Sequence, residues 1–439
     1  MVTFDNVLPT LVEVVEGLPD FPGLRTCAVV RDLHGKVRLV VEESEAGFDK
    51  EEAAKSLQRA LHGYFEGPIW SIPGEGPDEA RLARALLERA TEWTPEVRDV
   101  STGAKRNAQG SWRKYERRLS KSAWLDQGAP YPPWPIENGP CITAFYSFKG
   151  GIGRTTALAS CAWQLAEEGK RVVILDLDLE APGIGTLLEV ESERGLLDLL
   201  VDGIVTGTVD LEGAHAPARV LDVADRVIVL PAGRLNENFL EKLARLDFSS
   251  HGAHDKPPSD GSPVEKALRA ILKAVKTKLR PDYIFLDARS GIHDLSGLSL
   301  HRLAHTDVLL SRAGEQSYQG FALTLRSLIR LKGAKNVRCT VVHSMATPGD
   351  TPAVLEERAE FRQRVYKVFE SEIYANMAAQ RPLLDTVDAP HQPYVIPFNS
   401  ELLRFASIKS QRSNLMRDEY KFLHQRIIAV ASTDPGDDE

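Results

Sequence analysis

The sequence predicts an α/β chain: a mostly parallel, twisted sheet with helices on both faces, preceded by a small α+β module. Two observations predict this fold class. From Cys141 onward, apolar runs of strand length alternate with segments of helical periodicity, as in successive βαβ units. These runs are apolar throughout rather than alternating, which is typical of strands buried on both faces of a parallel sheet.

Residues 1–125 are expected to form the α+β module, and no motif in them indicates a particular chemistry. Apolar residues at helical spacing predict a helix over residues 5–17, and residues 24–31 and 37–41 have the composition of strands. An acidic start predicts a second helix over residues 49–64.

A basic stretch and a proline-rich segment follow. Residues 105–121 contain one acid, Glu116, and the basic residues Lys105, Arg106, Arg113, Lys114, Arg117, Arg118 and Lys121. Such a run is either a solvated helix face or a surface for nucleic acid or an acidic partner. Residues 126–140, which include GAPYPPWPIENGP, are expected to be an extended linker because proline favours extended backbone.

Residues 141–432 are expected to hold the parallel sheet, and residues 433–439 to form an acidic tail. The first βαβ unit runs from CITAFYSF through a glycine-rich loop and a helix to RVVILDLD. Further buried strands are expected over residues 226–230, 283–287, 307–310 and 337–343.

The composition is that of a globular protein, since 43% of the 439 residues are hydrophobic and 26% are charged. No apolar run approaches the roughly 20 residues that cross a bilayer, and the N-terminal segment does not resemble a signal peptide. A cytoplasmic location without membrane attachment is therefore expected. The cysteines are far apart and form no CxxC pair, which disfavours a metal or disulfide framework. A net charge of −8 disfavours wholesale binding to nucleic acid.

The segment KGGIGRTT follows a predicted strand and opens a predicted helix, which is the context of a phosphate-binding loop. Glycines allow successive backbone N–H groups to turn inward around phosphates, and the helix N-terminus adds its positive end. The hydroxyl of Thr155 is suited to hold Mg²⁺ between the β- and γ-phosphates of ATP. The residues expected to bind the nucleotide are Gly150, Gly151, Ile152, Gly153, Arg154, Thr155 and Thr156.

KGGIGRTT, VVILDLDLEAPG and YIFLDARSG, in this order and spacing, resemble the motifs of the deviant Walker A ATPases, a group that includes ParA and MinD. The resemblance covers residues 141 to about 400. It implies a P-loop NTPase fold and identifies Lys149 as the signature lysine, which would reach ATP held by a second subunit. An ATP-dependent homodimer is therefore expected.

The same resemblance implies roles for acids and for a switch loop. Asp178 would position the attacking water, Asp176 would assist near the magnesium, and Asp287 would hold the metal through a water as the Walker B acid. Gly291 falls in the switch loop that senses the γ-phosphate. His343 stands where relatives often place an adenine-contacting asparagine, and the alternative is a plain histidine at the end of a strand.

One residue departs from the usual motif. Arg154 replaces the ordinary P-loop lysine, as in a KGGxGR subgroup, and its planar fork differs in shape from the point charge of a lysine. Nucleotide binding is expected to survive this change and hydrolysis to be slow. Arg289, in the switch loop, either contacts phosphate or solvates the loop.

The leading functional hypothesis is a homodimeric ATPase whose nucleotide state is sensed by an unidentified partner protein. One alternative is an ATP-binding switch with little or no hydrolysis. A second alternative is a ParA-like ATPase that binds DNA without sequence specificity, which the net charge disfavours.

Overall fold

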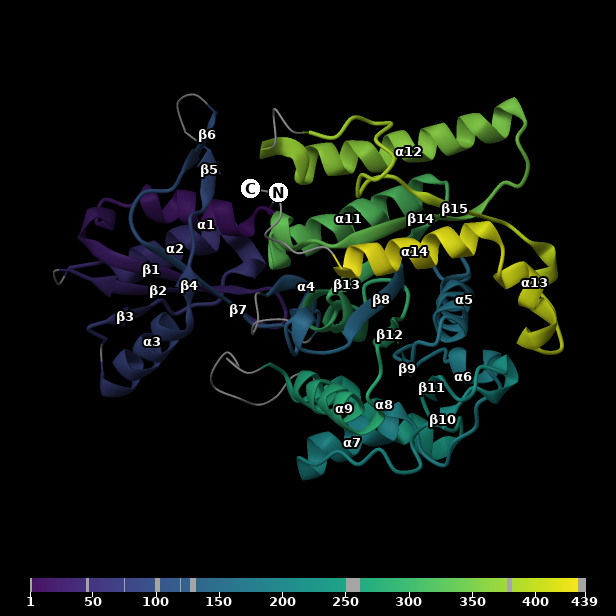
Figure 1. Ribbon diagram of the computed structural model, residues 1–439. Helices are drawn as coiled ribbons and strands as arrows, with labels where there is room; N and C mark the ends of the chain where they lie inside the picture. Colours follow the sequence, from purple (N-terminus) through teal and green to yellow (C-terminus); the bar gives the residue numbers. More distant parts are fainter. Residues whose placement is uncertain are drawn as a thin grey trace. The chain divides into compact units, whose positions relative to one another are not determined.

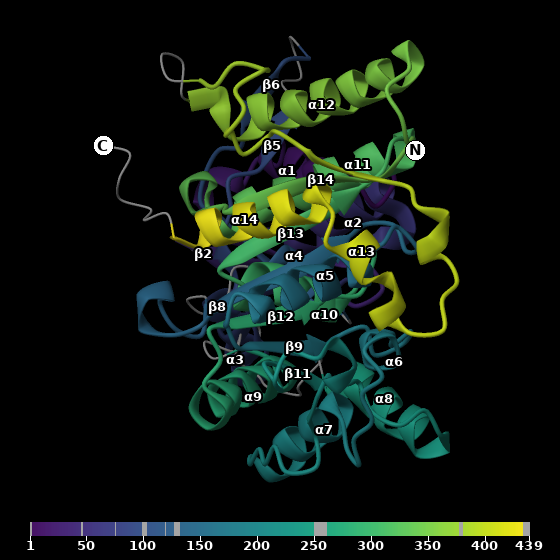
Figure 2. The same ribbon diagram turned by 45° about the vertical axis from the view of Figure 1, so that its right-hand side comes forward.

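The computed structural model describes residues 2–44, 47–74, 76–98, 103–118, 120–126, 132–249, 261–376 and 381–432. They divide into two compact units, one before Ser120 and one from Ser120 onward (Figures 1 and 2). The expected acidic tail and residues 127–131 of the expected linker lie outside the described residues. Among the described residues, no helix combines the length and the apolar character needed to span a membrane.

The first unit contains a five-stranded sheet in the order β3-β2-β1-β7-β4 and a separate two-stranded sheet of β5 and β6. The strands are β1 Leu24–Arg31, β2 Val37–Glu43, β3 Trp70–Ile72, β4 Thr91–Glu92, β5 Glu96–Arg98, β6 Lys105–Asn107 and β7 Trp112–Glu116. The helices are α1 Val7–Glu16, α2 Lys50–Leu61 and α3 Pro77–Arg89. The two helices and two strands predicted here are therefore present.

Side chains alternate across the larger sheet of this unit. Along β1, Cys27 and Val29 join the core formed with α1 and α2, whereas Ala28 and Val30 pack with α3. Helices thus cover both faces of the sheet, and each face has its own small apolar core.

The basic stretch over residues 105–121 is not a helix face, so that expectation is wrong. It supplies β6 and β7, and β7 pairs in parallel with β1 inside the larger sheet. Trp112 and Tyr115 pack on opposite faces of that sheet. The stretch therefore buries aromatic side chains on both faces. Its one acid, Glu116, forms ion pairs at 3.7 Å with Lys114 of the same stretch and with Arg31 of β1.

The second unit is built on an eight-stranded sheet in the order β10-β11-β9-β12-β8-β13-β14-β15. Every neighbouring pair is parallel except β10 with β11. The strands are β8 Cys141–Ser147, β9 Val172–Asp176, β10 Ala216–Pro217, β11 Val227–Leu230, β12 Tyr283–Asp287, β13 Thr306–Ser311, β14 Cys339–Ala346 and β15 Tyr394–Pro397. The predicted fold class is confirmed.

Helices cover both faces of this sheet. Along β8, Ile142, Ala144 and Tyr146 join one core and Phe145 joins the other. In Figure 1, α11 and α12 lie by β14, and α7, α8 and α9 lie at the other end of the sheet. The helices are α4 Ser122–Leu125, α5 Arg154–Glu167, α6 Ile184–Leu187, α7 Leu196–Thr206, α8 Glu237–Ser249, α9 Pro263–Leu279, α10 Asp294–Leu298, α11 Glu315–Lys332, α12 Pro352–Glu372, α13 Arg412–Leu415 and α14 Asp418–Ser432.

The segment that precedes β8 packs into the second unit. Trp124 in α4 and Trp134 are both buried in the core that contains α9 and α11. Trp134 Nε1 donates to the carbonyl of Pro140 across 3.0 Å, and its own carbonyl lies 2.8 Å from Nε2 of His305. The described part of the proline-rich segment is therefore anchored by specific contacts.

Candidate functional site

The glycine-rich loop connects the C-terminal end of β8 to the first turn of α5. Gly151 and Gly153 have φ values of 69° and 82°, a left-handed conformation that glycine adopts at little cost. Gly153 is the N-cap of α5, so the first N–H groups of this helix have no intrahelical acceptor. Ser147 and Ser344 fix the loop by donating hydroxyl hydrogen bonds to the carbonyls of Lys149 and Ile152. The loop thus presents a helix N-terminus of the kind that binds phosphate.

Acidic side chains stand where two neighbouring strands end. Asp176 is the last residue of β9 and Asp287 the last of β12, and the two are paired in register. Asp178 follows two residues after Asp176. Since β12 also pairs with β8, the parallel strands bring these acids to the edge of the sheet at which the loop begins.

Arg154 and Thr155, the first two residues of α5, bind these acids directly. Arg154 Nε donates to Oδ1 of Asp287 across 2.7 Å, and its Nη2 donates to Oδ2 of Asp178 across 2.8 Å. The hydroxyl of Thr155 donates to Oδ2 of Asp287, also across 2.8 Å. Burial lowers the pKa of Arg154, but the charges of Asp287 and Asp178 outweigh it and raise that pKa.

Two buried carboxylate oxygens in this cluster have no hydrogen-bond partner among the described residues: Oδ2 of Asp176 and Oδ1 of Asp178. Burial, and then the charge of Asp287, raise the pKa of Asp176 well above its ordinary value. Burial also raises the pKa of Asp287, against the opposing effect of Arg154. Such groups are costly unless a cation or a proton satisfies them.

These residues fit magnesium bound together with a phosphate. Within the described ranges, no three His, Cys, Asp or Glu side chains form a self-contained metal site. Mg²⁺ does not require one, because it keeps several waters and is usually held by one or two carboxylates together with substrate phosphates. The hydroxyl of Thr155 and the carboxylate of Asp287, which lie beside the helix N-terminus, are oxygen groups of the kind that bind Mg²⁺.

Residues 288–293, between β12 and α10, are the loop that the resemblance identifies as a switch loop, and they are called the switch loop below. This loop is hydrogen-bonded to the strand that leads into the glycine-rich loop. Gly291, with a φ of 76°, donates its N–H to the carbonyl of Ser147 across 3.1 Å. The hydroxyl of Tyr146 donates to the carbonyl of Gly291 across 3.2 Å. A shift of the switch loop would therefore be transmitted to the C-terminal end of β8.

The switch loop also contacts the loop that carries Asp178. Glu180 forms an ion pair with Arg289, and its Oε1 lies 2.9 Å from Nε2 of His293. Arg289 was expected either to contact phosphate or to solvate the loop; the structure adds an acidic partner, Glu180, and does not test the contact with phosphate. The sequence contained no signal for the pairing, because Glu180 and Arg289 belong to different strand-end loops.

Lys149 and His343 have different surroundings. Lys149 is partly exposed in the loop, and its ammonium makes no ion pair with the described residues. His343 is buried, with its ring stacked on Phe361 at 4.0 Å between centroids, and burial lowers its pKa to about 4. Successive side chains of a strand point to opposite faces, so it is Ser344, which the sequence did not single out, that reaches the loop.

Comparisons with known proteins point to one group. A family model described as ParA: NUBPL iron-transfer P-loop NTPase matches residues 141–204, which include the glycine-rich loop, Asp176 and Asp178. The carbon monoxide dehydrogenase accessory protein CooC of Rhodospirillum rubrum is 26% identical over 221 residues, covering 48% of this chain and 78% of that protein. The chromosome-partitioning ATPase Soj of Thermus thermophilus is 28% identical over 255 residues, covering 56% and 86%.

Further similarities are weaker. The septum site-determining protein MinD of Helicobacter pylori is 25% identical over 169 residues, covering 38% of this chain and 51% of that protein. Among solved structures, apo McdA of Cyanthece aligns with a TM-score of 0.45 at 14% identity, over 66% of this chain and 98% of that one.

Proposed function

The chain carries a P-loop ATPase domain of the ParA/MinD-like group, and from this premise we propose that it is a magnesium-dependent ATPase whose nucleotide state controls a partner protein. One observation carries the proposal. The first turn of α5 is connected by Arg154 and Thr155 to the acids that end β12 and follow β9. Phosphate-binding amides, a metal-binding hydroxyl and a water-orienting carboxylate are thereby held together.

Each residue has a part in this proposal. The N–H groups of the loop and of the first turn of α5 hold the phosphates, and Thr155 with Asp287 holds the metal. Bound ATP with magnesium would supply the transferable phosphoryl group and the positive charge that stabilises it. Asp178 orients the attacking water through the carboxylate oxygen that Arg154 leaves unpaired. Asp176 adds a second acid beside Asp287.

A switch with little hydrolysis is the second candidate, and the position of Arg154 favours it. The guanidinium binds both Asp178 and Asp287, the acids assigned to water and metal. An arginine fork can hold two carboxylates at once, whereas a lysine at this position offers a single point charge. Competition between Arg154 and the reacting groups for these acids would slow turnover without preventing ATP from binding.

Iron transfer, which the matching family's description mentions, has little support in this chain. The cysteines Cys27, Cys141, Cys161 and Cys339 are all buried. Burial raises the pKa of Cys339 to about 12, so its thiol does not ionise readily to the thiolate that binds metals.

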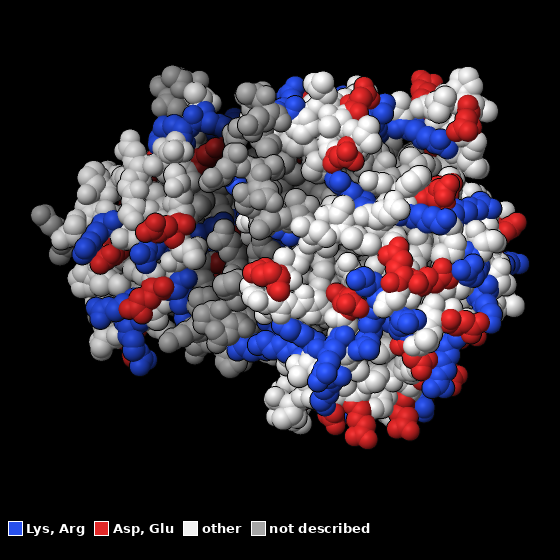
Figure 3. All heavy atoms as spheres, in the orientation of Figure 1, with Lys and Arg blue, Asp and Glu red and all other residues white. Residues whose placement is uncertain are grey.

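DNA binding also has little support. In Figure 3, basic and acidic side chains are interspersed over most of the visible face of the second unit, and a band of basic side chains near its lower edge has acidic side chains directly below it. In the first unit, the basic stretch is part of a sheet and carries ion pairs such as Arg106 with Glu16, at 2.6 Å. Binding that depends on many phosphate contacts would need a larger uniform field.

Two measurements on the same preparation test the proposed function. Calorimetry with ATP, in the presence and absence of magnesium, measures binding, and phosphate release measures turnover. We expect magnesium-dependent binding together with slow release. Binding without detectable release would favour the second candidate, and the absence of binding under both conditions would refute both.

A further inference from the structure

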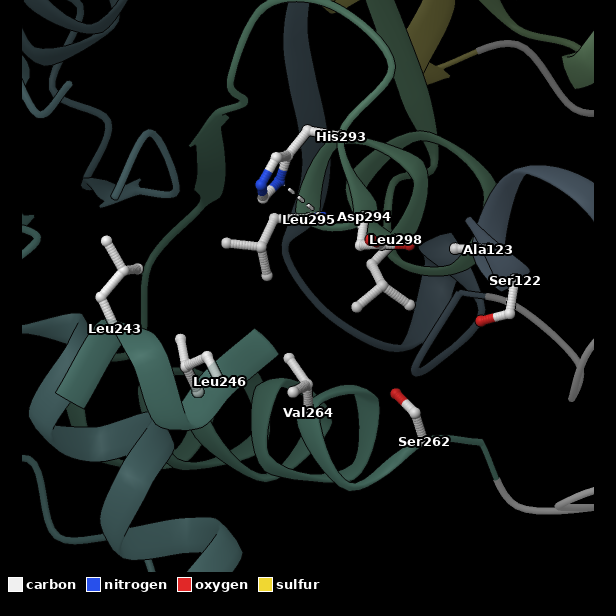
Figure 4. Close-up of a pocket in the computed structure, with 10 residues that line it drawn as sticks. All are labelled: Ser122, Ala123, Leu243, Leu246, Ser262, Val264, His293, Asp294, Leu295 and Leu298. Carbon is white, nitrogen blue, oxygen red and sulfur yellow. Dashed lines mark hydrogen bonds between the residues drawn. The ribbon is translucent and has the colours of Figure 1, made fainter. Parts of the chain in front are cut away.

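The chain segment that follows the first unit lies directly against the switch loop. The backbone N–H of Lys121 donates to Oδ1 of Asp294 across 2.5 Å, and its Nζ lies 3.2 Å from Oδ2 of the same carboxylate. Trp124 Nε1 donates to the carbonyl of His293 across 2.6 Å. Figure 4 shows Ser122 and Ala123 of this segment near Asp294. Residues 120–126, here called the α4 segment, therefore bind the end of the switch loop through both backbone and side chains.

The residues of the α4 segment that make these contacts are closely packed against the rest of the second unit. Trp124 is 4% exposed and meets His301 edge-on at 4.9 Å between ring centroids. A Cβ atom at Gly297 would come within 2.6 Å of the Trp124 ring, so this close approach requires a glycine. The carbonyl of Trp124 accepts hydrogen bonds from Ser327 and Arg330 of α11. The α4 segment is thus held between the switch region and α11.

The backbone conformation of Lys121 also indicates that this end of the α4 segment is held in place. Its φ is 68°, a left-handed conformation that is uncommon for a residue with a side chain. The carboxylate of Asp294 binds both the N–H and the ammonium of this residue and so compensates for the strained conformation. Loss of Asp294 would remove both contacts at once.

Direct contacts connect the α4 segment to the nucleotide-binding site. The ring of Trp124 lies 6.0 Å from that of Tyr146, whose hydroxyl donates to the carbonyl of Gly291. His293, whose carbonyl accepts from Trp124, also contacts Glu180 in the loop that carries Asp178. Movement of either strand-end loop would therefore change contacts of the α4 segment.

A pocket lies beside the end of the switch loop. This pocket, beside His293 and Asp294, is lined mainly by aliphatic side chains from α8, α9 and α10, with Ser122 and Ala123 at one side (Figure 4). The aliphatic residues are Leu243, Leu246, Val264, Leu295 and Leu298.

We propose that the α4 segment is a relay that couples the switch loop to the point where the first unit is attached. This proposal rests on the proposed function, because the change that the α4 segment would transmit is a nucleotide-dependent change in the switch loop. The α4 segment continues the chain directly from the first unit, so a change in its hold on Asp294 and His293 alters how that unit is tethered. Coupling of this kind is reciprocal: a change in the α4 segment also changes nucleotide affinity.

Hydrogen exchange of the full-length chain tests the relay. Exchange is followed in peptides that cover the α4 segment and the switch loop, without nucleotide and with a non-hydrolysable ATP analogue plus magnesium. We expect the analogue to change the exchange rates of both peptides. The equilibrium constant for local opening of each segment should change by about fivefold or more. In Asp294→Ala, the switch loop should still respond and the α4 segment should not. An unchanged response of the α4 segment in this variant would overturn the proposal.

Lys114→Ala provides the matched control, because it removes a basic side chain from β7, within the same basic stretch, that pairs with Glu116 rather than with the switch loop. Because coupling is reciprocal, Asp294→Ala should change the affinity for the ATP analogue, and Lys114→Ala should leave this affinity unchanged. Equal affinities for all three proteins would also count against the relay.

A nucleotide-independent arm separates failure of the relay from failure of the proposed function. In Gly291→Ala, the left-handed φ of 76° becomes strained, which perturbs the switch loop without any ligand. The relay predicts faster exchange in the α4 segment of this variant even if the chain does not bind ATP at all. If the switch loop exchanges faster and the α4 segment does not, the relay is wrong whatever the nucleotide measurements show.

Discussion

Arg154 Nε donates a hydrogen bond to Oδ1 of Asp287 across 2.7 Å, and both side chains are almost wholly buried. Because Nη2 of the same guanidinium binds Asp178, two acids, one ending β12 and one following β9, share a single cation. Phosphate groups and magnesium would compete for the partners in this network: the phosphates for the guanidinium, and the metal for the carboxylate of Asp287. Turnover then depends on how readily Arg154 exchanges its acidic partners for phosphate.

The first prediction concerns Arg154→Lys. A lysine ammonium cannot reproduce the fork that holds both acids, so Asp178 becomes free to orient water while a positive charge remains for the phosphates. We expect hydrolysis about tenfold faster, which corresponds to roughly 1.4 kcal/mol off the barrier, with little change in ATP affinity. Phosphate release at saturating ATP measures this effect.

Arg154→Ala is the matched comparison for this substitution. It removes the cation proposed to bind the phosphates; a charge-assisted hydrogen bond is worth about 1.5–3 kcal/mol, so loss of one such bond to phosphate should lower ATP affinity roughly 10- to 100-fold. If Arg154→Lys hydrolyses ATP no faster than the parent chain, arginine is not what limits turnover.

A second prediction concerns Thr155→Ala. Loss of the hydroxyl removes one proposed metal ligand and the hydrogen bond to Asp287, so magnesium-dependent ATP binding should weaken by at most about 3 kcal/mol. Calorimetry with and without magnesium separates the metal-dependent part. Thr277→Ala serves as the control, since it removes an exposed threonine hydroxyl of α9 that donates to the carbonyl of Lys273, outside the site. Equal magnesium dependence in the parent chain and in Thr155→Ala would remove Thr155 from the metal site.

The third prediction concerns Asp178. If this carboxylate orients the attacking water, Asp178→Ala should lower kcat sharply and leave ATP affinity nearly unchanged, because the interaction is made mainly in the transition state. Asp178→Asn keeps the shape and an oxygen that can accept from Arg154, and it should be impaired as well. Normal turnover in Asp178→Asn would reduce Asp178 to a partner of Arg154.

Local patterns predicted those parts of the site that depend on neighbours in sequence. The apolar runs located β8, β9 and β12, and the glycine spacing located the turn into α5. The partners of Arg154 could not be read in this way, because Asp287 lies 133 residues away and the contact depends on how three strands align. The pair of Glu180 with Arg289 was missed for the same reason.

The charge pattern led to a wrong prediction of secondary structure for the basic stretch, because burial of aromatic side chains determines its structure. The basic stretch before the α4 segment looked like a solvated helix face, but the aromatic residues Trp112 and Tyr115 make it a strand inside a sheet. The proline-rich segment was predicted to be an extended linker, and within its described residues Trp134 is buried in the core of the second unit. Single aromatic residues within a polar run carry more information about burial than the surrounding charges do.

The last prediction joins Lys149 to dimerisation. The loop already has inward-facing amides, and Arg154 already supplies a cation within the same subunit. Lys149 is partly exposed and forms no ion pair with the described residues, so its charge is surplus to a single-subunit site. We propose that it reaches the phosphates of ATP held by a second copy, where it would stabilise transferred charge as an arginine finger does.

Lys149→Ala should therefore weaken ATP-dependent dimerisation and hydrolysis more than it weakens ADP binding to one subunit, because ATP favours the closed dimer only through contacts made in that state. Sedimentation with a non-hydrolysable ATP analogue measures the dimer, and calorimetry with ADP measures the single-subunit site. Lys170→Ala is a suitable control, since it removes an exposed lysine that lies outside the loop, just before β9. A parent chain that stays monomeric with the analogue, or a Lys149→Ala variant that dimerises equally well, would rule out a contact across subunits and leave Lys149 to act, if at all, on the nucleotide of its own subunit.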